Sequence, residues 1–418
     1  MRSAGRWVGA MTCGLAVIVA AIVGQTFLSA AFAQDWPQWR GVNRDGKASG
    51  FAAPAAWPKE LTQKWKVAVG AGTDATPALV GDKLYVFARS GGDEITLCLN
   101  AADGKEVWRD KYAVATIGGP SARAHAGPRS SPAVADGKVV TLGVTGTLSC
   151  LNAADGKLLW RKDDVKAVPQ FFTASSPMIV DGMVIAHLGG GGNGALMAFD
   201  LATGAEKWKC DKQPAMYASP VLQTVGGVKT VASLGEKNLF GVALADGKLL
   251  WEVAFAPTGR MGYNACTPIV DGDTVYIAGS GRGTKAFKIE KAGDAFSAKE
   301  LWSSADGAVQ FNTPVLTGGL LFGYSDKGSL FCVSAKDGKS AWTKEVGKGG
   351  FCAIVDAGAV LFALPNNSEL VVYKPSDKGY EEVAKYKASS AQTYAYPIVS
   401  GNRIFIMDQD ALTLWTLP

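Results

Sequence analysis

A self-similar segment that ends in tryptophan returns along most of the chain. Residues 148–160 read LSCLNAADGKLLW, which is an apolar run, an Asp-Gly turn and a short run that closes on Trp160. Related segments close on Trp108, Trp208, Trp251 and Trp342. The unit returns about every 40–50 residues and is rich in apolar runs and glycine turns, a pattern typical of a propeller or a solenoid.

Recurring residues mark both ends of the repeat unit, and at each end they occur eight times. The unit closes on an aromatic residue, at Trp65, Trp108, Trp160, Trp208, Trp251, Trp302, Trp342 and Tyr386. It opens with Ser-Pro, Thr-Pro or Tyr-Pro at residues 76, 131, 176, 219, 267, 313 and 396, and an eighth opening at 353–355 lacks the proline. Asp-Gly pairs such as Asp136-Gly137 lie between apolar runs and indicate two-residue hairpins. Each unit is therefore predicted to be a four-stranded antiparallel blade.

The two ends of the repeat region predict how the ring closes. The segment at Trp65 has the closing aromatic residue but no repeat before it, and the last unit, 397–417, supplies only three strands. We therefore predict an all-β, eight-bladed propeller over residues 65–418, closed by the N-terminal strand joining the C-terminal blade. Such a ring leaves no unpaired sheet edge at its seam. A seven-bladed ring is the alternative if the weak seventh unit is not a blade.

The first 33 residues differ in composition from the rest. Arg2 and Arg6 precede a long apolar stretch that ends in an Ala-Phe-Ala sequence at residues 31–33. This pattern predicts a secretory signal peptide, and we expect an exported, periplasmic or cell-envelope protein with no transmembrane span after cleavage. The alternative is an uncleaved anchor, because the apolar stretch is long enough to cross a membrane.

Residues 34–64 form an N-terminal arm that begins QDWPQWRGVNRDG. Trp36 and Trp39 are too apolar for a free linker, so we expect the arm to lie across one face of the ring with both rings buried.

Charge and cysteine usage exclude several classes of protein. Without Arg2 and Arg6, the only charged residues of the signal segment, the net charge falls from +5 to +3, which is too small to favour nucleic acid. The six cysteines after residue 33 contain no CxxC spacing, so no metal site is predicted. Cys98, Cys150 and Cys332 occupy matching positions in three repeats and are expected to be free, buried core residues.

One copy of the repeat resembles a known motif. Residues 198–208 read AFDLATGAEKW and match AxDxxTGxxxW, the tryptophan-docking motif of the pyrroloquinoline-quinone (PQQ) type propellers. Other copies match less fully, with Asn100 and Asn152 where the family often has Asp. The resemblance implies a structural docking role for the closing tryptophans, at Trp65, Trp108, Trp160, Trp208, Trp251, Trp302 and Trp342.

The family that this motif resembles has two branches. Quinoprotein dehydrogenases hold PQQ with calcium in the central funnel, usually beside an Asp base and in several members a disulfide between adjacent cysteines. The chain has no adjacent cysteines and no CxxCH haem motif. The other branch resembles the outer-membrane assembly factor BamB, a scaffold that binds partners and no cofactor. We therefore expect a monomeric, non-enzymatic, exported scaffold with a protein partner in the cell envelope or a ligand; a PQQ-dependent oxidoreductase is the alternative.

The mouth of the central channel is the expected place for a ligand. The candidate residues are the polar and aromatic side chains that precede the inner strands. They are His125, Arg129, Phe172, Tyr217, Tyr263, Asn264, Gln310, Asn312 and Tyr394. Such a set could hold a planar or sugar-like ligand, and the alternative is a water-filled funnel. No catalytic residue is predicted, because His125 has no Asp or Cys partner near it in the sequence, and His187 is expected to be structural.

Overall fold

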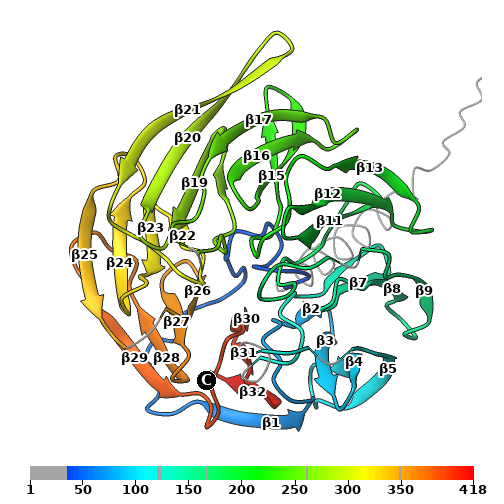
Figure 1. Cartoon of the computed structure of the whole chain (residues 1–418). Coiled ribbons are helices and arrows are strands. Elements are labelled where there is room, and N and C mark those ends of the chain that lie inside the picture. The colour runs from blue at the N-terminus through cyan, green and yellow to red at the C-terminus, as the bar shows by residue number, and fades with distance from the viewer. Residues whose placement is uncertain (1–34, 116, 120–124, 166, 260–261, 348–349) are drawn as a thin grey trace, which may run out of the picture.

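The chain folds into eight four-stranded antiparallel sheets arranged in a ring (Figure 1). The computed structural model describes residues 35–418 except 116, 120–124, 166, 260–261 and 348–349, so the expected signal segment lies outside the described residues. The eight-bladed all-β prediction is confirmed, and the seven-bladed alternative is wrong, because β26–β29 form a complete seventh blade. Among the described residues, no helix has the length and hydrophobicity that crossing a membrane would require.

The first four blades follow one another along the chain. Blade 1 comprises β2 (Ala78–Val80), β3 (Lys83–Ser90), β4 (Asp93–Asn100) and β5 (Glu106–Ala113). Blade 2 comprises β6 (Ala133–Ala135), β7 (Lys138–Leu142), β8 (Leu148–Asn152) and β9 (Leu158–Lys162). Blade 3 comprises β10 (Met178–Val180), β11 (Met183–Gly190), β12 (Asn193–Asp200) and β13 (Glu206–Cys210). Blade 4 comprises β14 (Val221–Val225), β15 (Val228–Leu234), β16 (Asn238–Ala243) and β17 (Leu249–Ala254).

The last four blades complete the ring. Blade 5 comprises β18 (Ile269–Asp271), β19 (Thr274–Gly279), β20 (Gly283–Ala292) and β21 (Ala295–Ser304). Blade 6 comprises β22 (Val315–Thr317), β23 (Leu320–Tyr324), β24 (Ser329–Ser334) and β25 (Ser340–Glu345). Blade 7 comprises β26 (Cys352–Asp356), β27 (Leu361–Pro365), β28 (Glu369–Tyr373) and β29 (Glu382–Lys387). Blade 8 comprises β30 (Ile398–Ser400), β31 (Arg403–Met407), β32 (Ala411–Thr416) and β1 (Thr62–Ala68).

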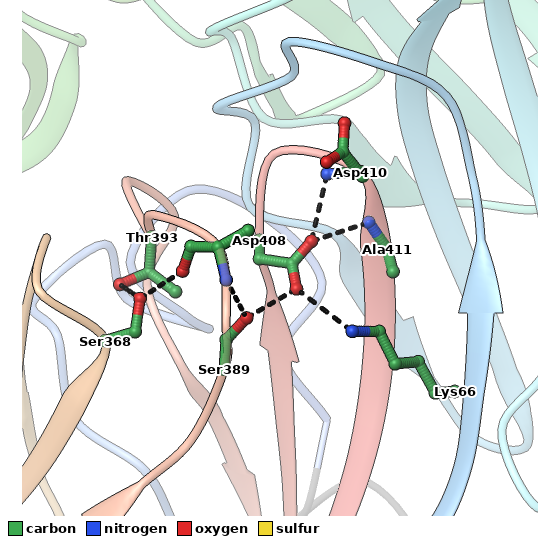
Figure 2. Close-up of polar contacts among 8 residues, drawn as sticks. Lys66, Ser368, Ser389, Thr393, Asp408, Asp410 and Ala411 are labelled. Atoms are coloured by element: carbon green, nitrogen blue, oxygen red, sulfur yellow. Dashed lines mark hydrogen bonds and ion pairs between the residues drawn. The ribbon is translucent and has the colours of Figure 1, made fainter.

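Blade 8 is closed by a strand from the other end of the chain, as the sequence predicts. β1 pairs antiparallel with β32 and begins at Thr62, three residues before Trp65. Figure 2 shows the polar contacts at this seam. Asp408 is 2% exposed, accepts a hydrogen bond from Ser389 Oγ at 2.6 Å, and lies 3.7 Å from Lys66 Nζ on β1. The seam is therefore fixed by a buried carboxylate as well as by the ladder.

The closing tryptophans connect neighbouring blades. Trp208 donates its indole N–H to the carbonyl of Leu244 in the next blade at 2.9 Å, and Trp160 donates to Leu201 at 3.1 Å. The glycine of the following Asp-Gly or Thr-Gly turn lies under the ring: a Cβ placed on Gly204 would be 2.7 Å from Trp160 Cδ2. This turn needs glycine because the ring fills the space and φ is +71°.

Blade 5 departs from this pattern. Its hairpin β20–β21 is longer than the others and extends beyond the ring in Figure 1. Ile289 occupies the position in blade 5 that Leu244 occupies in blade 4, but it is paired with Ala298 inside the longer ladder. The preceding tryptophan, Trp251, therefore has no acceptor, and its indole nitrogen is buried without a partner.

The residues that open each unit form a hydroxyl belt around the channel. The backbone N–H of one belt residue donates to the hydroxyl of the next blade: Ser131 to Ser176 at 2.9 Å, Ser176 to Ser219 at 2.9 Å, and Thr267 to Thr313 at 2.9 Å. The backbone N–H of Tyr396, which leads into blade 8, donates to the hydroxyl of Thr76, which leads into blade 1, at 2.8 Å. We call the channel end where the inner strands begin the mouth, and the end where they finish the base.

The N-terminal arm enters the channel instead of only lying across a face. Trp36 is 1% exposed and pairs with Leu79 on the inner strand of blade 1, and Asp35 accepts a hydrogen bond from Gly81 at the base. Trp39 is half-buried and donates to the hydroxyl of Thr267 at 3.0 Å, so the chain has by then reached the hydroxyl belt. Residues 40–46, the arm turn, reverse the chain, and Ala48 bonds to Asp356 at the base again.

All six cysteines of the described chain are free and buried, which confirms the prediction. Burial raises the pKa of Cys98 to about 11 and of Cys150 to about 12. Because the thiolate is the reactive form, these positions are chemically inert and serve packing.

Candidate binding site at the mouth of the channel

Seven rings contact one another around the mouth and form an aromatic belt. They come from the loops that lead into the inner strands, and in order of contact they are His125, Tyr394, Phe351, Phe311, Tyr263, Tyr217 and Phe171. The centroids of Phe311 and Phe351 are 5.1 Å apart, and those of His125 and Tyr394 are 4.7 Å apart. Phe311 is the most open of them, at 40% exposure.

Arg129 joins the two ends of the aromatic belt. Its guanidinium donates to the carbonyl of Phe171 and, at 2.9 Å, to the carbonyl of His125. The hydroxyl of Tyr217 accepts a hydrogen bond from the backbone of Phe171 at 2.8 Å, and Tyr263 is hydrogen-bonded to Gln310. Six of the predicted site residues thus lie in or against the belt: His125, Arg129, Tyr217, Tyr263, Gln310 and Tyr394.

His125 has an orienting carboxylate that the sequence did not reveal. Its Nδ1 lies 2.7 Å from Oδ2 of Asp74, which is 51 residues earlier in the chain. Burial raises the pKa of Asp74, while the hydrogen bond with His125 and the charge of Arg129 oppose that rise. The Asp74 side chain is 9% exposed and that of His125 is 26% exposed, so the imidazole is the accessible member of the pair.

Two predicted site residues serve the blades themselves. Asn264 is 1% exposed, and its amide donates to the carbonyls of Gly235 and Phe255 while it accepts from Arg282. Asn312 is 3% exposed and exchanges hydrogen bonds with the backbone of Tyr324. Both amides are occupied by protein groups and are not available to a ligand at the mouth.

Three members of the belt are absent from the sequence prediction: Phe171, Phe311 and Phe351. Phe311 and Phe351 lie two positions before residues 313 and 353, where units 6 and 7 open, as Tyr217 and Tyr394 do before 219 and 396. This two-residue spacing to the unit's opening would have found Phe311 and Phe351 but not Phe171, which lies five positions before the opening at 176. The sequence prediction named Phe172 and Gln310, which are the immediate neighbours of Phe171 and Phe311.

His187 lies away from the mouth, inside blade 3. It is 1% exposed, its Nε2 lies 2.8 Å from the carbonyl of Gln213, and its Nδ1 lies 3.2 Å from the hydroxyl of Ser233. A neutral ring protonated on Nε2 satisfies both contacts. Burial lowers the pKa of His187 to about 4, against a small opposite effect of the Gln213 hydrogen bond.

The depressed pKa of His187 predicts a pH-dependent stability. Below pH 6.5 the imidazole of His187 becomes protonated in the unfolded chain, whereas in the folded chain it stays neutral down to about pH 4. The free energy of unfolding therefore falls as the pH falls toward 4. We expect a loss of about 1.6 kcal/mol between pH 6.5 and pH 5 from this residue. The measurement is urea unfolding at both pH values for the native chain and for His187→Gln. An equal loss in the two proteins would contradict the prediction.

The mouth does not match what a PQQ-calcium centre requires. No group of three or more His, Cys, Asp or Glu side chains suited to a metal ion occurs in the described part of the chain. The described cysteines are free thiols, and Asp74 is a single carboxylate whose Oδ2 is engaged by His125 while its Oδ1 is buried without a partner. These donors fit neither a calcium site nor a disulfide platform for the quinone.

Comparison with known proteins decides the family. Residues 98–344, more than half of the chain, match the family model described as outer membrane protein assembly factor BamB. The chain belongs to the BamB family. The BamB of Burkholderia pseudomallei is 24% identical over 362 residues, which cover 84% of this chain and 86% of that protein.

Solved structures of both branches share the fold. BamB from Moraxella catarrhalis superposes with a TM-score of 0.61 at 17% identity, covering 85% of this chain and 98% of that one. A quinohemoprotein alcohol dehydrogenase from Comamonas testosteroni superposes with a TM-score of 0.67 at 15% identity, covering 94% and 82%. At these identities the likeness extends to the fold, so BamB membership rests on the sequence match.

Proposed function

We propose that the protein is a non-enzymatic scaffold of the cell envelope that docks a protein partner on the aromatic belt. The observation that carries the proposal is the belt itself, a continuous surface of rings at the mouth with Phe311 40% exposed. Aromatic side chains are enriched in the centres of protein interfaces, because they bury large areas at little entropic cost. The relatives named as outer membrane protein assembly factors support an exported protein that works with other proteins.

Site-specific crosslinking tests this proposal. A photo-crosslinking amino acid would replace Phe311, and the matched control would carry it at Val107, which is 46% exposed on the outer strand β5. We expect one discrete adduct with an envelope protein from position 311, none from position 107, and loss of the adduct in Tyr263→Ser. Equal adducts at both positions, or none at 311, would contradict docking at the mouth.

The alternative, a PQQ-dependent oxidoreductase, is tested on the same protein. PQQ with calcium would be added to the purified chain, and the thermal midpoint and the quinone absorbance would be followed. A ligand that binds the folded state raises the apparent stability by mass action. We expect no change; a saturable rise with a bound quinone spectrum would favour the dehydrogenase branch over the scaffold.

A further inference from the structure

The arm turn carries two arginines into the middle of the channel. Arg40 is 0% exposed and Arg44 is 3% exposed, which is rare for a charged side chain. Both have positive φ, 60° and 59°, a conformation that costs a non-glycine residue energy and persists only when the surroundings fix it. The pair is therefore a built feature of the channel, separate from the aromatic belt and from the proposed docking function.

The contacts of the two guanidinium groups leave their charge uncompensated. Their acceptors are all uncharged oxygens, for example the carbonyls of Thr313 and Pro314 for Arg40 and of Ser176 and Pro177 for Arg44. Burial, together with repulsion by the charge of Arg40, lowers the pKa of Arg44 to about 9. A buried charge normally has a counter-charge, because desolvation is costly.

Arg44 also has a buried N–H group with no hydrogen-bond acceptor. Its two Nη atoms bond to Gln38, Pro177 and Ser176, while its Nε is buried and has no hydrogen-bond partner. The hydroxyl of Ser131 is buried without a partner too, and Ser131 is hydrogen-bonded to Ser176, whose carbonyl accepts from Arg44. The positive charge of Arg44 and two buried groups without hydrogen-bond partners, Arg44 Nε and the Ser131 hydroxyl, thus occur together where the arm turn meets the hydroxyl belt.

We propose that the channel binds a small inorganic anion, such as chloride, against the Nε edge of Arg44. An anion there supplies the missing counter-charge for both arginines and an acceptor for the unfilled N–H. Each of the other side-chain nitrogens of Arg40 and Arg44 already bonds to at least one protein oxygen, and both groups are almost fully buried, so the site suits a single small ion.

Anion exchange at constant ionic strength tests the site. The full chain would be prepared in sodium gluconate, and sodium chloride would replace it stepwise while the thermal midpoint is measured. We expect a saturable rise of about 2–4 °C, since the ion binds only the folded state. Arg44→Gln should abolish the rise. Arg282→Gln is the matched control, because Arg282 also has an unpartnered, buried Nε but stacks on Phe255 with no second arginine against it.

A structural readout keeps the proposal testable if Arg44→Gln does not fold. Crystals of the native chain soaked in sodium bromide should show an anomalous scattering peak beside Arg44 Nε. A peak there supports the site. Its absence, or a chloride response that survives in Arg44→Gln, would overturn the proposal.

Discussion

Replacing Trp208 with alanine should lower the free energy of unfolding by about 3–5 kcal/mol. Trp208 is 6% exposed and packs between its own blade and the next, against Val231, Phe240 and Leu244. The change removes a large buried side chain and opens a cavity at a blade interface. Urea unfolding followed by circular dichroism gives the free energy directly.

A pair of phenylalanine substitutions separates packing from hydrogen bonding at the same position. Trp208→Phe keeps an aromatic ring but leaves the carbonyl of Leu244 without its 2.9 Å donor, whereas Trp251→Phe has no such bond to lose. We expect Trp208→Phe to be the more costly by about 1 kcal/mol or more. Equal costs would mean that the indole hydrogen bond contributes nothing to the association of blades.

Arg40→Met should destabilise the protein by about 3–5 kcal/mol, an effect as large as that of a core truncation. All five N–H groups of Arg40 are used: Nε bonds to Arg44, Nη1 to Thr313 and Tyr396, and Nη2 to Asp45 and Pro314. Methionine has a similar stem but no donor, so it leaves these buried oxygens unpaired.

Lys47→Met is the matched control for Arg40→Met. Lys47 lies on the same arm with an exposed side chain, and its substitution should change the free energy of unfolding by less than about 0.5 kcal/mol. If Arg40→Met proved as mild as Lys47→Met, the arm would be an accessory segment. We expect instead that it unfolds together with the ring.

The repeat made the fold predictable, because each unit carries its own local signals. Ser-Pro or Thr-Pro opens the inner strand, Asp-Gly turns the hairpins, and the closing tryptophan needs the glycine of the next unit. These signals act within tens of residues and occur in nearly every unit. Even the weak seventh unit keeps enough of them, with Tyr386 5% exposed in place of the tryptophan.

The features that could not be predicted from the sequence depend on contacts between segments that are far apart in the chain. His125 is oriented by Asp74, and Arg40 is bonded to Thr313, 273 residues later, so no local pattern shows either pairing. The arm was expected across a face of the ring, yet its arginines occupy the channel, because a turn with four residues at positive φ, two of them arginines, reverses the chain there. Asn264 and Asn312 stand at the right places in the sequence, but their side chains turn into the blades.

The position of Asp35 gives the molecule a direction. Asp35 is bonded to Gly81 at the base, whereas Phe311 and the other rings lie at the opposite end of the channel axis. A tether attached at the N-terminal side would therefore hold the protein at the base of the channel. The aromatic belt at the mouth would then face away from the attachment point. A partner approaching from the far side would meet the aromatic surface first, with the whole depth of the ring between it and the tether.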